Sequence, residues 1–249
     1  MFALLDRGLR AADAALGAER HPWRAAAALL TPGLLVLAVF GLWPMLHAVG
    51  LSLWGGRSGR GPFVGWANYA EALQGDAFWQ SVWVTVYFVL GTVPATLALS
   101  FLIAAGLHRV QRGGGLLRTL YFLPYVTSTV AAALVWRALL DPRHGVANAA
   151  LAGAGLPGQQ WLLEPRGVLH LLSGGAVPAD WGPSLALCCI MVFDIWHGVG
   201  FMVVVFLAGL AAVPRDLEDA ARLDGAHGLR RLWHVVLPLV SPTAFFLLV

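Results

Sequence analysis

Three residues with hydrogen-bonding or stacking side chains stand inside one apolar run. Asp194, Trp196 and His197 lie within residues 184–212, and Asp194 is the only acid inside an apolar run of this chain. A carboxylate in hydrocarbon costs a few kcal/mol, so it marks a functional site or has a partner. His197 follows Asp194 by one helical turn, on the same helix face.

Two interpretations of these residues stay open. In the first, they line a path for a solute rich in hydroxyl groups: Asp194 and His197 form hydrogen bonds with it, and the Trp196 indole stacks on it. In the second, Asp194 and His197 form a structural pair, or both lie in water near a membrane interface. The hydroxyls of residues 127–129 have the same two options, because each can also bond a carbonyl of its own helix.

A polar stretch, residues 214–237, separates this apolar run from the next one. It holds eight charged side chains: Arg215, Asp216, Glu218, Asp219, Arg222, Asp224, Arg230 and Arg231. Each costs roughly 2.5–3.5 kcal/mol at a bilayer centre, so the stretch must lie in water at a membrane face.

The same stretch predicts two short helices. Pro214 suits a first helical turn, acids follow where the helix dipole is positive, and Gly225 is a stop signal. The second helix is expected from Leu229 to Leu237, running into Pro238. Apolar residues share one face of the first helix at i, i+3, i+4 spacing: Leu217, Ala220 and Ala221. Such a face is typical of a docking surface and equally of an ordinary amphipathic loop helix.

This stretch resembles the cytoplasmic EAA loop of ABC-importer permeases of the carbohydrate-uptake type. The matching residues are Glu218, Ala220, Ala221, Asp224, Gly225, Ala226 and Pro238. Asp219 stands where a second glutamate is often found. In that family the loop forms a coupling helix that sits in a groove of the ATPase subunit, so the resemblance implies an ATPase-coupling role for these residues.

Other segments carry the same resemblance, which covers about residues 30–249. The sugar-type permeases share segments similar to 63–69, 118–125, 145–148, 194–196 and 207–210 of this chain. Residues 171–183 look like an insertion relative to the family. They end a long outer segment, 141–182, whose role the sequence leaves open.

The composition indicates a membrane protein. Of the 249 residues, 59% are hydrophobic and only 12% charged, against about 25% charged in soluble domains. Cys188 and Cys189 are adjacent in an apolar run and suggest neither a disulfide framework nor a metal site. The eight histidines are scattered, which argues against a membrane enzyme with a clustered site. The chain has no lysine, which excludes a Walker-A ATPase site here.

The expected fold class is an all-α, polytopic transmembrane helical bundle. Residues 1–24 form an N-terminal cytoplasmic tail and 25–249 a permease domain, whose spans are expected at 25–53, 79–107, 119–140, 184–212 and, incompletely, 239–249. Arginines are concentrated in the tail, in 108–118 and in 214–237, which favours a cytoplasmic N-terminus. The family resemblance implies that the membrane is the bacterial inner membrane. The family core has six spans, so a fragment of a longer chain is the favoured interpretation.

The resemblance implies a non-enzymatic permease subunit that forms the path for a sugar or polyol. Its implied partners are a second permease, an ATPase dimer, an extracytoplasmic solute-binding protein and membrane lipid; nucleic acid is not expected. ATP and Mg would bind in the ATPase, with no cofactor in this chain. Glycerol phosphate or a peptide is a rival cargo, although few arginines lie inside the spans. The alternative mechanism is a proton-coupled secondary transporter that uses Asp194 and His197 as a relay.

Overall fold

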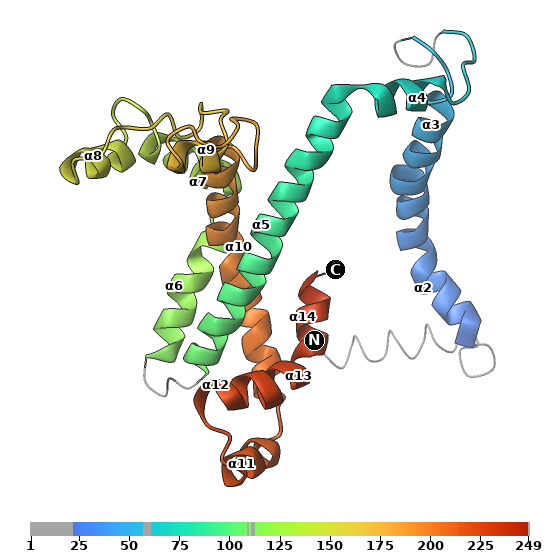
Figure 1. Ribbon diagram of the computed structural model, residues 1–249. Coiled ribbons are helices and arrows are strands. Elements are labelled where there is room, and N and C mark those ends of the chain that lie inside the picture. The colour runs from blue at the N-terminus through green and yellow to red at the C-terminus, as the bar shows by residue number, and fades with distance from the viewer. Residues whose placement is uncertain (1–21, 57–60, 109, 111–112, 249) are drawn as a thin grey trace. The chain divides into compact units, whose positions relative to one another are not determined.

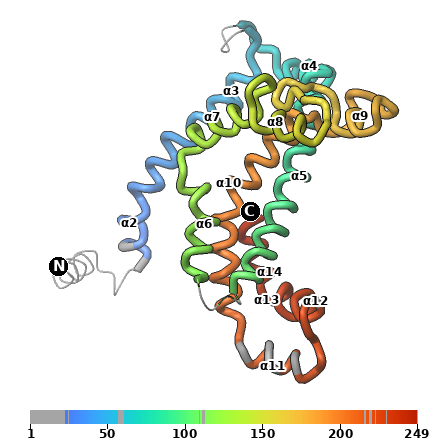
Figure 2. Tube along the Cα trace, turned by 90° about the vertical axis from the view of Figure 1, so that its left-hand side faces the viewer, coloured from blue at the N-terminus to red at the C-terminus, as the bar shows by residue number. Residues whose placement is uncertain are grey.

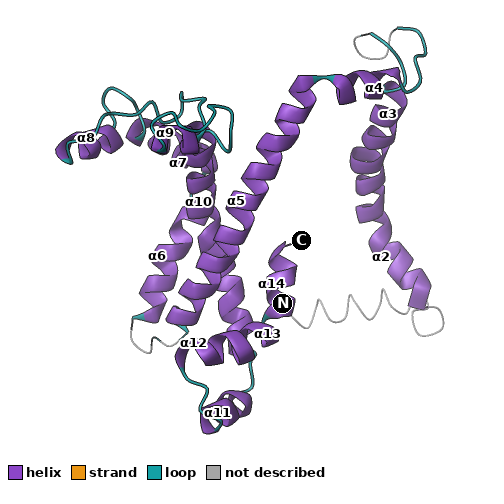
Figure 3. Ribbon diagram, viewed as in Figure 1, coloured by secondary structure: helices purple, strands orange, loops and turns teal. Residues whose placement is uncertain are grey.

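The computed structural model describes residues 22–56, 61–108, 110 and 113–248. Within the helices, the side chains of a few residues lie outside this description: Pro22, Ala25, Arg215, Glu218, Asp219, Arg222 and Leu229. Almost all of the predicted N-terminal tail also lies outside it. In the described ranges the regular structure is helical, and β-pairing is limited to two isolated bridges (Figure 3).

The chain divides into two compact units, 1–79 and 80–249. In the first, α2 (Pro22–Val36), the π-helix η1 (Leu37–Leu42) and α3 (Trp43–Leu51) follow one another (Figure 1). The stretch Ala26–Leu51 is long and apolar enough to cross a membrane. The π-turn lies directly before Pro44, which has no N–H and would clash with the carbonyl four residues earlier in a regular α-helix. Local widening of this kind is how membrane helices accommodate proline.

The loop after α3 is tied back to the end of that helix. Asn68, in α4 (Ala67–Gln74), donates from Nδ2 to the carbonyl oxygens of Ser52 and Trp54 at 2.8 and 3.0 Å. The Tyr69 hydroxyl lies 2.6 Å from the Ser52 hydroxyl. Gly65 has a φ of 56° and donates its N–H to Leu53. Gly65, Asn68 and Tyr69, all within the segment 63–69, therefore hold this turn in place.

Three helices dominate the second unit. They are α5 (Asp76–Leu107), which begins in the first unit, α6 (Gly114–Val126) and α10 (Leu185–Ala211). Helices α5 and α10 are each long and apolar enough to cross a membrane. The α6 and α10 helices pack along each other, as Figures 1 and 2 show.

The expected third span, 119–140, is not one straight helix. The α6 helix ends at Val126, α7 (Thr129–Leu139) begins after a two-residue break, and the two axes differ by 92°. At the break the Thr127 hydroxyl donates to the Pro124 carbonyl at 2.6 Å, and Thr127 has extended backbone angles. These local bonds replace the helical pattern at the bend.

The charged stretch forms a helical excursion from the end of α10. It holds α11 (Arg215–Leu223), α12 (Gly228–Arg231), the π-helix η3 (Leu232–Val236) and α13 (Leu237–Leu239), and the chain continues in α14 (Ser241–Leu248) (Figures 1 and 2). The second helix therefore begins at Gly228, one residue before the expected position, and does not end before Pro238. As at Pro44, a π-turn precedes the proline and lets the chain continue helically.

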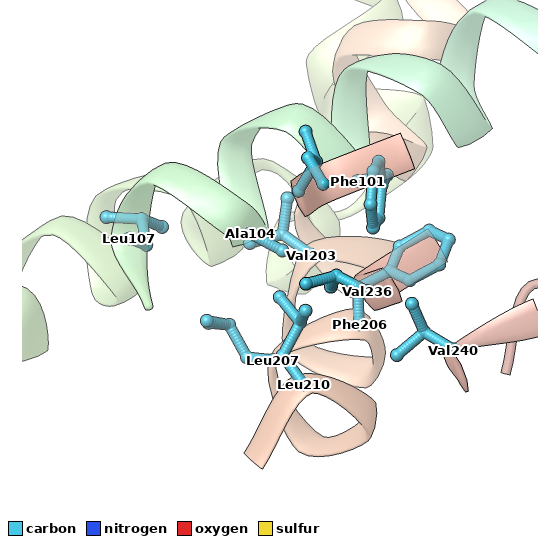
Figure 4. Close-up of a cluster of buried hydrophobic side chains, with 10 residues drawn as sticks. Phe101, Ala104, Leu107, Val203, Phe206, Leu207, Leu210, Val236 and Val240 are labelled. Atoms are coloured by element: carbon cyan, nitrogen blue, oxygen red, sulfur yellow. The ribbon is translucent and has the colours of Figure 1, made fainter. Parts of the chain in front are cut away.

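The main buried cluster joins this excursion to the long helices. Figure 4 shows side chains from α5, α10 and η3 meeting in one apolar core. Its buried members are Phe101, Ala104, Leu107, Val203, Phe206, Leu207, Leu210, Leu232, Val236 and Val240. The rings of Phe101 and Phe206 meet edge to face with centroids 5.6 Å apart. A displacement of η3 must therefore move α5 and α10 or break this packing.

The long outer segment is folded. It contains α8 (Val146–Gly153) and α9 (Val168–Leu172). The Asn148 side chain donates to the carbonyls of Pro142 and Gln159, and its Oδ1 accepts from Gln159 N–H and Trp161 Nε1, each at 2.9 Å. Four hydrogen bonds to one half-buried amide are characteristic of an ordered loop.

Candidate functional site

The bend between α6 and α7 meets α10 through an aromatic cluster. Tyr125 stacks on Phe201 with centroids 4.9 Å apart and lies 6.2 Å from the His197 ring. Trp136 contacts Phe193 and Trp196 at centroid distances of 5.8 and 5.6 Å. Aromatic faces with polar tips suit a solute that has both apolar and hydroxyl-bearing surfaces. We refer to these six rings as the bend cluster.

Two of the three residues predicted in α10 belong to the bend cluster. Trp196 packs on Trp136, while His197 lies 5.8 Å from Phe193 and has its Nε2 3.4 Å from the Thr129 hydroxyl. Thr129 therefore reaches across to α10. Thr127 instead bonds its own helix, as the second interpretation of these hydroxyls expected.

Asp194 is separate from the bend cluster. Its side chain is exposed, and within the described part of the chain its carboxylate has no hydrogen bond or ion pair. The Asp194–His197 pair that formed one interpretation is therefore absent from the described contacts, although the two residues are one turn apart. Trp196 lies about 200° around the helix from Asp194, so these two side chains point to different sides of α10.

The predicted coupling residues lie on the excursion. Helix α11 ends at a glycine with a left-handed backbone: Gly225 has a φ of 77°, and the N–H of Ala226 bonds the carbonyl of Ala221 at 2.9 Å. This six-to-one bond is the Schellman arrangement that closes a helix. An added β-carbon at Gly225 would meet no atom within 4 Å, so the glycine is required by the backbone angle alone.

The other members of this set differ in exposure. Ala221 is buried, whereas Ala220 and Asp224 are exposed and Ala226 is half-buried. Glu218 lies in α11, but its side chain is outside the described residues. Pro238 is exposed within α13. Beside them, Leu223 is 90% exposed at the end of α11, although it is a large apolar residue.

The outer segment bonds the first turn of α10. The N–H groups of Leu185 and Ala186 donate to the carbonyls of Arg166 and Glu164, and Ser184 Oγ accepts from Leu187 N–H. These bonds satisfy amides that have no partner inside a helix. The Arg166 guanidinium donates to both oxygens of the buried Glu164 carboxylate, from Nε to Oε1 and from Nη2 to Oε2, each at 2.7 Å. This pairing lowers the pKa of Glu164 to about 2.

A groove of about 630 Å³ opens beside this segment, at the N-terminal ends of α5 and α10. Aromatic and polar side chains line it, among them Gln80, Trp83, Tyr87, Asp180 and Trp181. The two rings on α5, Trp83 and Tyr87, lie 6.0 Å apart. In the described ranges no group of three or more His, Cys, Asp or Glu side chains could hold a metal ion.

Residues 96–249 match the model of a family described as the binding-protein-dependent transport system inner membrane component. This match covers more than half of the chain. The chain belongs to this family. The permease is therefore a multi-pass inner-membrane transport protein of an ABC importer, and the alternative of a proton-coupled secondary transporter is wrong.

Curated relatives agree with this assignment. The permease is 31% identical over 229 residues to the sn-glycerol-3-phosphate transport system permease protein UgpA of Agrobacterium fabrum, covering 89% of this chain and 70% of that one. The protein of the same name from Rhizobium meliloti is 33% identical over 230 residues, with the same coverage. The sequence resemblance to ABC-importer permeases of carbohydrate type is confirmed at the level of the family.

Solved structures confirm the all-α membrane fold. A chain of a bacterial ABC transporter involved in the import of the acidic polysaccharide alginate superposes with a TM-score of 0.69 at 24% identity, covering 93% of this chain and 72% of that chain. A second alginate transporter structure, in complex with a periplasmic protein bound to an alginate pentasaccharide, gives 0.67 at 20% identity, covering 92% and 70%.

Several residues of the site escaped the sequence reasoning. Tyr125 lies in the segment 118–125, which resembles the family, and Phe193 is next to Asp194. No sequence pattern marked these two residues, Trp136 or Phe201 as parts of a site. Aromatic residues are common in membrane helices, so the sequence carries no signal that these four converge. Tyr125 reaches Phe201 because α6 packs along α10, and Trp136 reaches Phe193 because α7 contacts α10 after the 92° bend.

Proposed function

We propose that this permease lines the translocation path for a sugar or related polyol with the bend cluster and Asp194. The observation that carries the proposal is an exposed carboxylate on a span helix, one turn from a histidine packed among aromatic rings. A carboxylate without a partner on a membrane-spanning helix requires hydrogen bonds from water, from a partner chain or from a cargo. Hydroxyl groups can donate to Asp194, and the His197 ring, one turn away on the same face of α10, can contact the same solute.

A phosphorylated polyol is the second candidate cargo. It is favoured by the curated relatives, which are sn-glycerol-3-phosphate transport permeases. The negative charge of Asp194 opposes it, since like charges at close range repel. The two candidates differ in one measurable respect: an anionic cargo should enter better when Asp194 is neutral, whereas a neutral polyol should lose a hydrogen-bond acceptor.

We assign the role of coupling the permease to its ATPase to α11. The exposed Leu223 and Ala220 next to the Gly225 turn suit insertion into a groove of a soluble ATPase, because an exposed apolar residue is stabilised when a partner covers it. ATP and Mg would bind in that ATPase, and hydrolysis would displace the excursion. The buried cluster around Phe101 and Phe206 would pass the displacement to α5 and α10.

The remaining parts of the proposal concern topology and partners. In the proposed topology the loop that contains α11 lies on the cytoplasmic side of the membrane. The N-terminal tail lies on the same side, because arginines are concentrated in both segments. A second permease completes the path. The folded outer segment, with the aromatic groove beside it, is the docking platform for an extracytoplasmic solute-binding protein.

The test is purification of the tagged permease from its native membranes in mild detergent, with identification of the proteins that accompany it in stoichiometric amount. We expect an ATPase and a second permease. Gly225→Pro and Glu218→Arg should lose the ATPase and keep the second permease. If the wild-type protein is isolated without an ATPase from membranes of cells that take up the cargo, the coupling role of α11 is refuted.

A further inference from the structure

A cavity of about 440 Å³ lies at the inner ends of three helices of the second unit. His108 follows the last residue of α5, Arg118 lies in the second turn of α6, and Ala211 is the last residue of α10. The rest of the lining comes from α10: Val204, Leu207 and Ala208. A cavity at the ends of span helices lies at the depth of lipid headgroups.

The rim of this cavity is basic. His108 and Arg118 are exposed, and in the described part of the chain neither side chain has an ion pair or a hydrogen bond. The connecting segment, 108–118, contains Arg109 and Arg112 as well and no acid. Positive charge without a protein counter-ion at a membrane surface attracts an anion.

The floor of the cavity is apolar and open. Val204 is 42% exposed, and the small side chains of Ala208 and Ala211 are also exposed, so α10 presents a shallow hydrocarbon surface below the basic rim. A soluble anion would leave this floor in contact with water. A molecule with a phosphate head and a hydrocarbon chain satisfies both parts at once, since basic pockets between membrane helices bind such head groups.

We propose that this cavity binds an anionic phospholipid, with the phosphate between His108 and Arg118 and the start of an acyl chain on Val204 and Ala208. The lipid would fill the space between the ends of α5, α6 and α10, next to the buried cluster that joins them to the excursion. The site is separate from the bend cluster and from α11, so the proposal stands whichever cargo the importer carries.

The test measures lipid retained by the purified importer complex. The detergent-solubilised complex is incubated with phosphatidylglycerol or with phosphatidylcholine at equal concentration, and the lipid that stays bound is counted by native mass spectrometry. We expect the wild type to retain phosphatidylglycerol over phosphatidylcholine. Arg118→Gln should lower phosphatidylglycerol retention about five-fold, the value for one basic residue at an anionic surface. Arg143→Gln, the same change in the outer segment, should leave it unaltered.

Two further arms separate a lipid site from an anion site. Ala208→Phe keeps both basic residues and fills the floor, so it should lower phosphatidylglycerol retention to the phosphatidylcholine level. Inorganic phosphate in excess should fail to displace the bound lipid. Retention that Ala208→Phe leaves unchanged, displacement by phosphate, or equal retention of the two lipids by the wild type would each overturn the proposal. Size-exclusion profiles establish that each variant is assembled.

Discussion

Gly200 of α10 lies directly against the backbone of Tyr121 in α6. A β-carbon on this glycine would overlap the Tyr121 carbonyl group and press on the Cα of Phe122. The same helix has a second close approach at Gly209, where an added β-carbon would lie 2.6 Å from the Thr243 hydroxyl of α14. Small residues permit such approaches where dispersion forces drive helix association in membranes.

Gly200→Ala should therefore destabilise the permease strongly. The atoms in the way belong to the backbone, so no side chain can rotate to make room, and we expect a cost of about 3 kcal/mol, the upper end of the range for overpacking. The measurement is the temperature at which the purified complex loses its monodisperse size-exclusion peak, which should fall by roughly 5–10 °C.

Gly198→Ala is the matched control for this prediction. Gly198 lies in the same helix, but a β-carbon there would meet no atom within 4 Å. Its transition temperature should equal that of the wild type or rise slightly, since alanine is the better helix former. Equal losses in the two variants would mean that α6 and α10 do not approach at Gly200.

The coupling loop should respond to the backbone preference at Gly225. Gly225→Ala forces a β-carbon into a left-handed conformation at a cost of roughly 1–2 kcal/mol, although the space around it is free. We expect ATPase stimulation by the binding protein to fall several-fold in reconstituted vesicles. Gly225→Asn should retain more coupling than the alanine variant, because asparagine tolerates this conformation better. The reverse order would contradict a conformational role.

The path hypothesis predicts a transport defect without an assembly defect. Asp194→Asn should lower uptake of a neutral polyol or sugar by more than ten-fold, because the carboxylate is the strongest acceptor on that face of α10, while the variant still purifies with its partners. Uptake of radiolabelled cargo into cells measures the effect. Asp76→Asn, the same change at an exposed acid in the first turn of α5, should change uptake far less. Wild-type uptake by Asp194→Asn would end the assignment of this residue to the path.

The Glu164–Arg166 pair should make the outer end of α10 sensitive to acid. Its folded-state pKa of about 2 lies below the usual 4.5, so the stabilising interaction is complete above pH 4.5 and is lost as the pH falls toward 2. Hydrogen exchange of residues 164–187, corrected for the intrinsic rate, should accelerate over that interval. Glu164→Gln should exchange faster already at pH 6 and lose the dependence on pH. An unchanged rate from pH 5 to 2.5 in the wild type would contradict it.

Much of the fold could be predicted because it depends on local composition. The long apolar stretches of α5 and α10 require hydrocarbon around them, and the charges of 214–237 exclude that segment from it. The stop at Gly225 was equally visible, since the left-handed angle found there is one that glycine adopts freely. Expectations about single sites, such as the pairing of Asp194 with His197, depended on neighbours that the sequence does not specify.

By itself the sequence determined that this chain is a membrane helical protein of the importer-permease type, with a charged helical excursion between two apolar helices. Only the tertiary structure decided that α6 and α7 meet at 92°, that Tyr125 stacks on Phe201, and that Arg166 and Glu164 hold the start of α10. The physical reason is the separation, along the chain, of the residues that interact. Hydropathy and glycine angles are properties of neighbouring residues, whereas ring contacts and close approaches such as Gly200 on Tyr121 join segments that lie far apart along the chain.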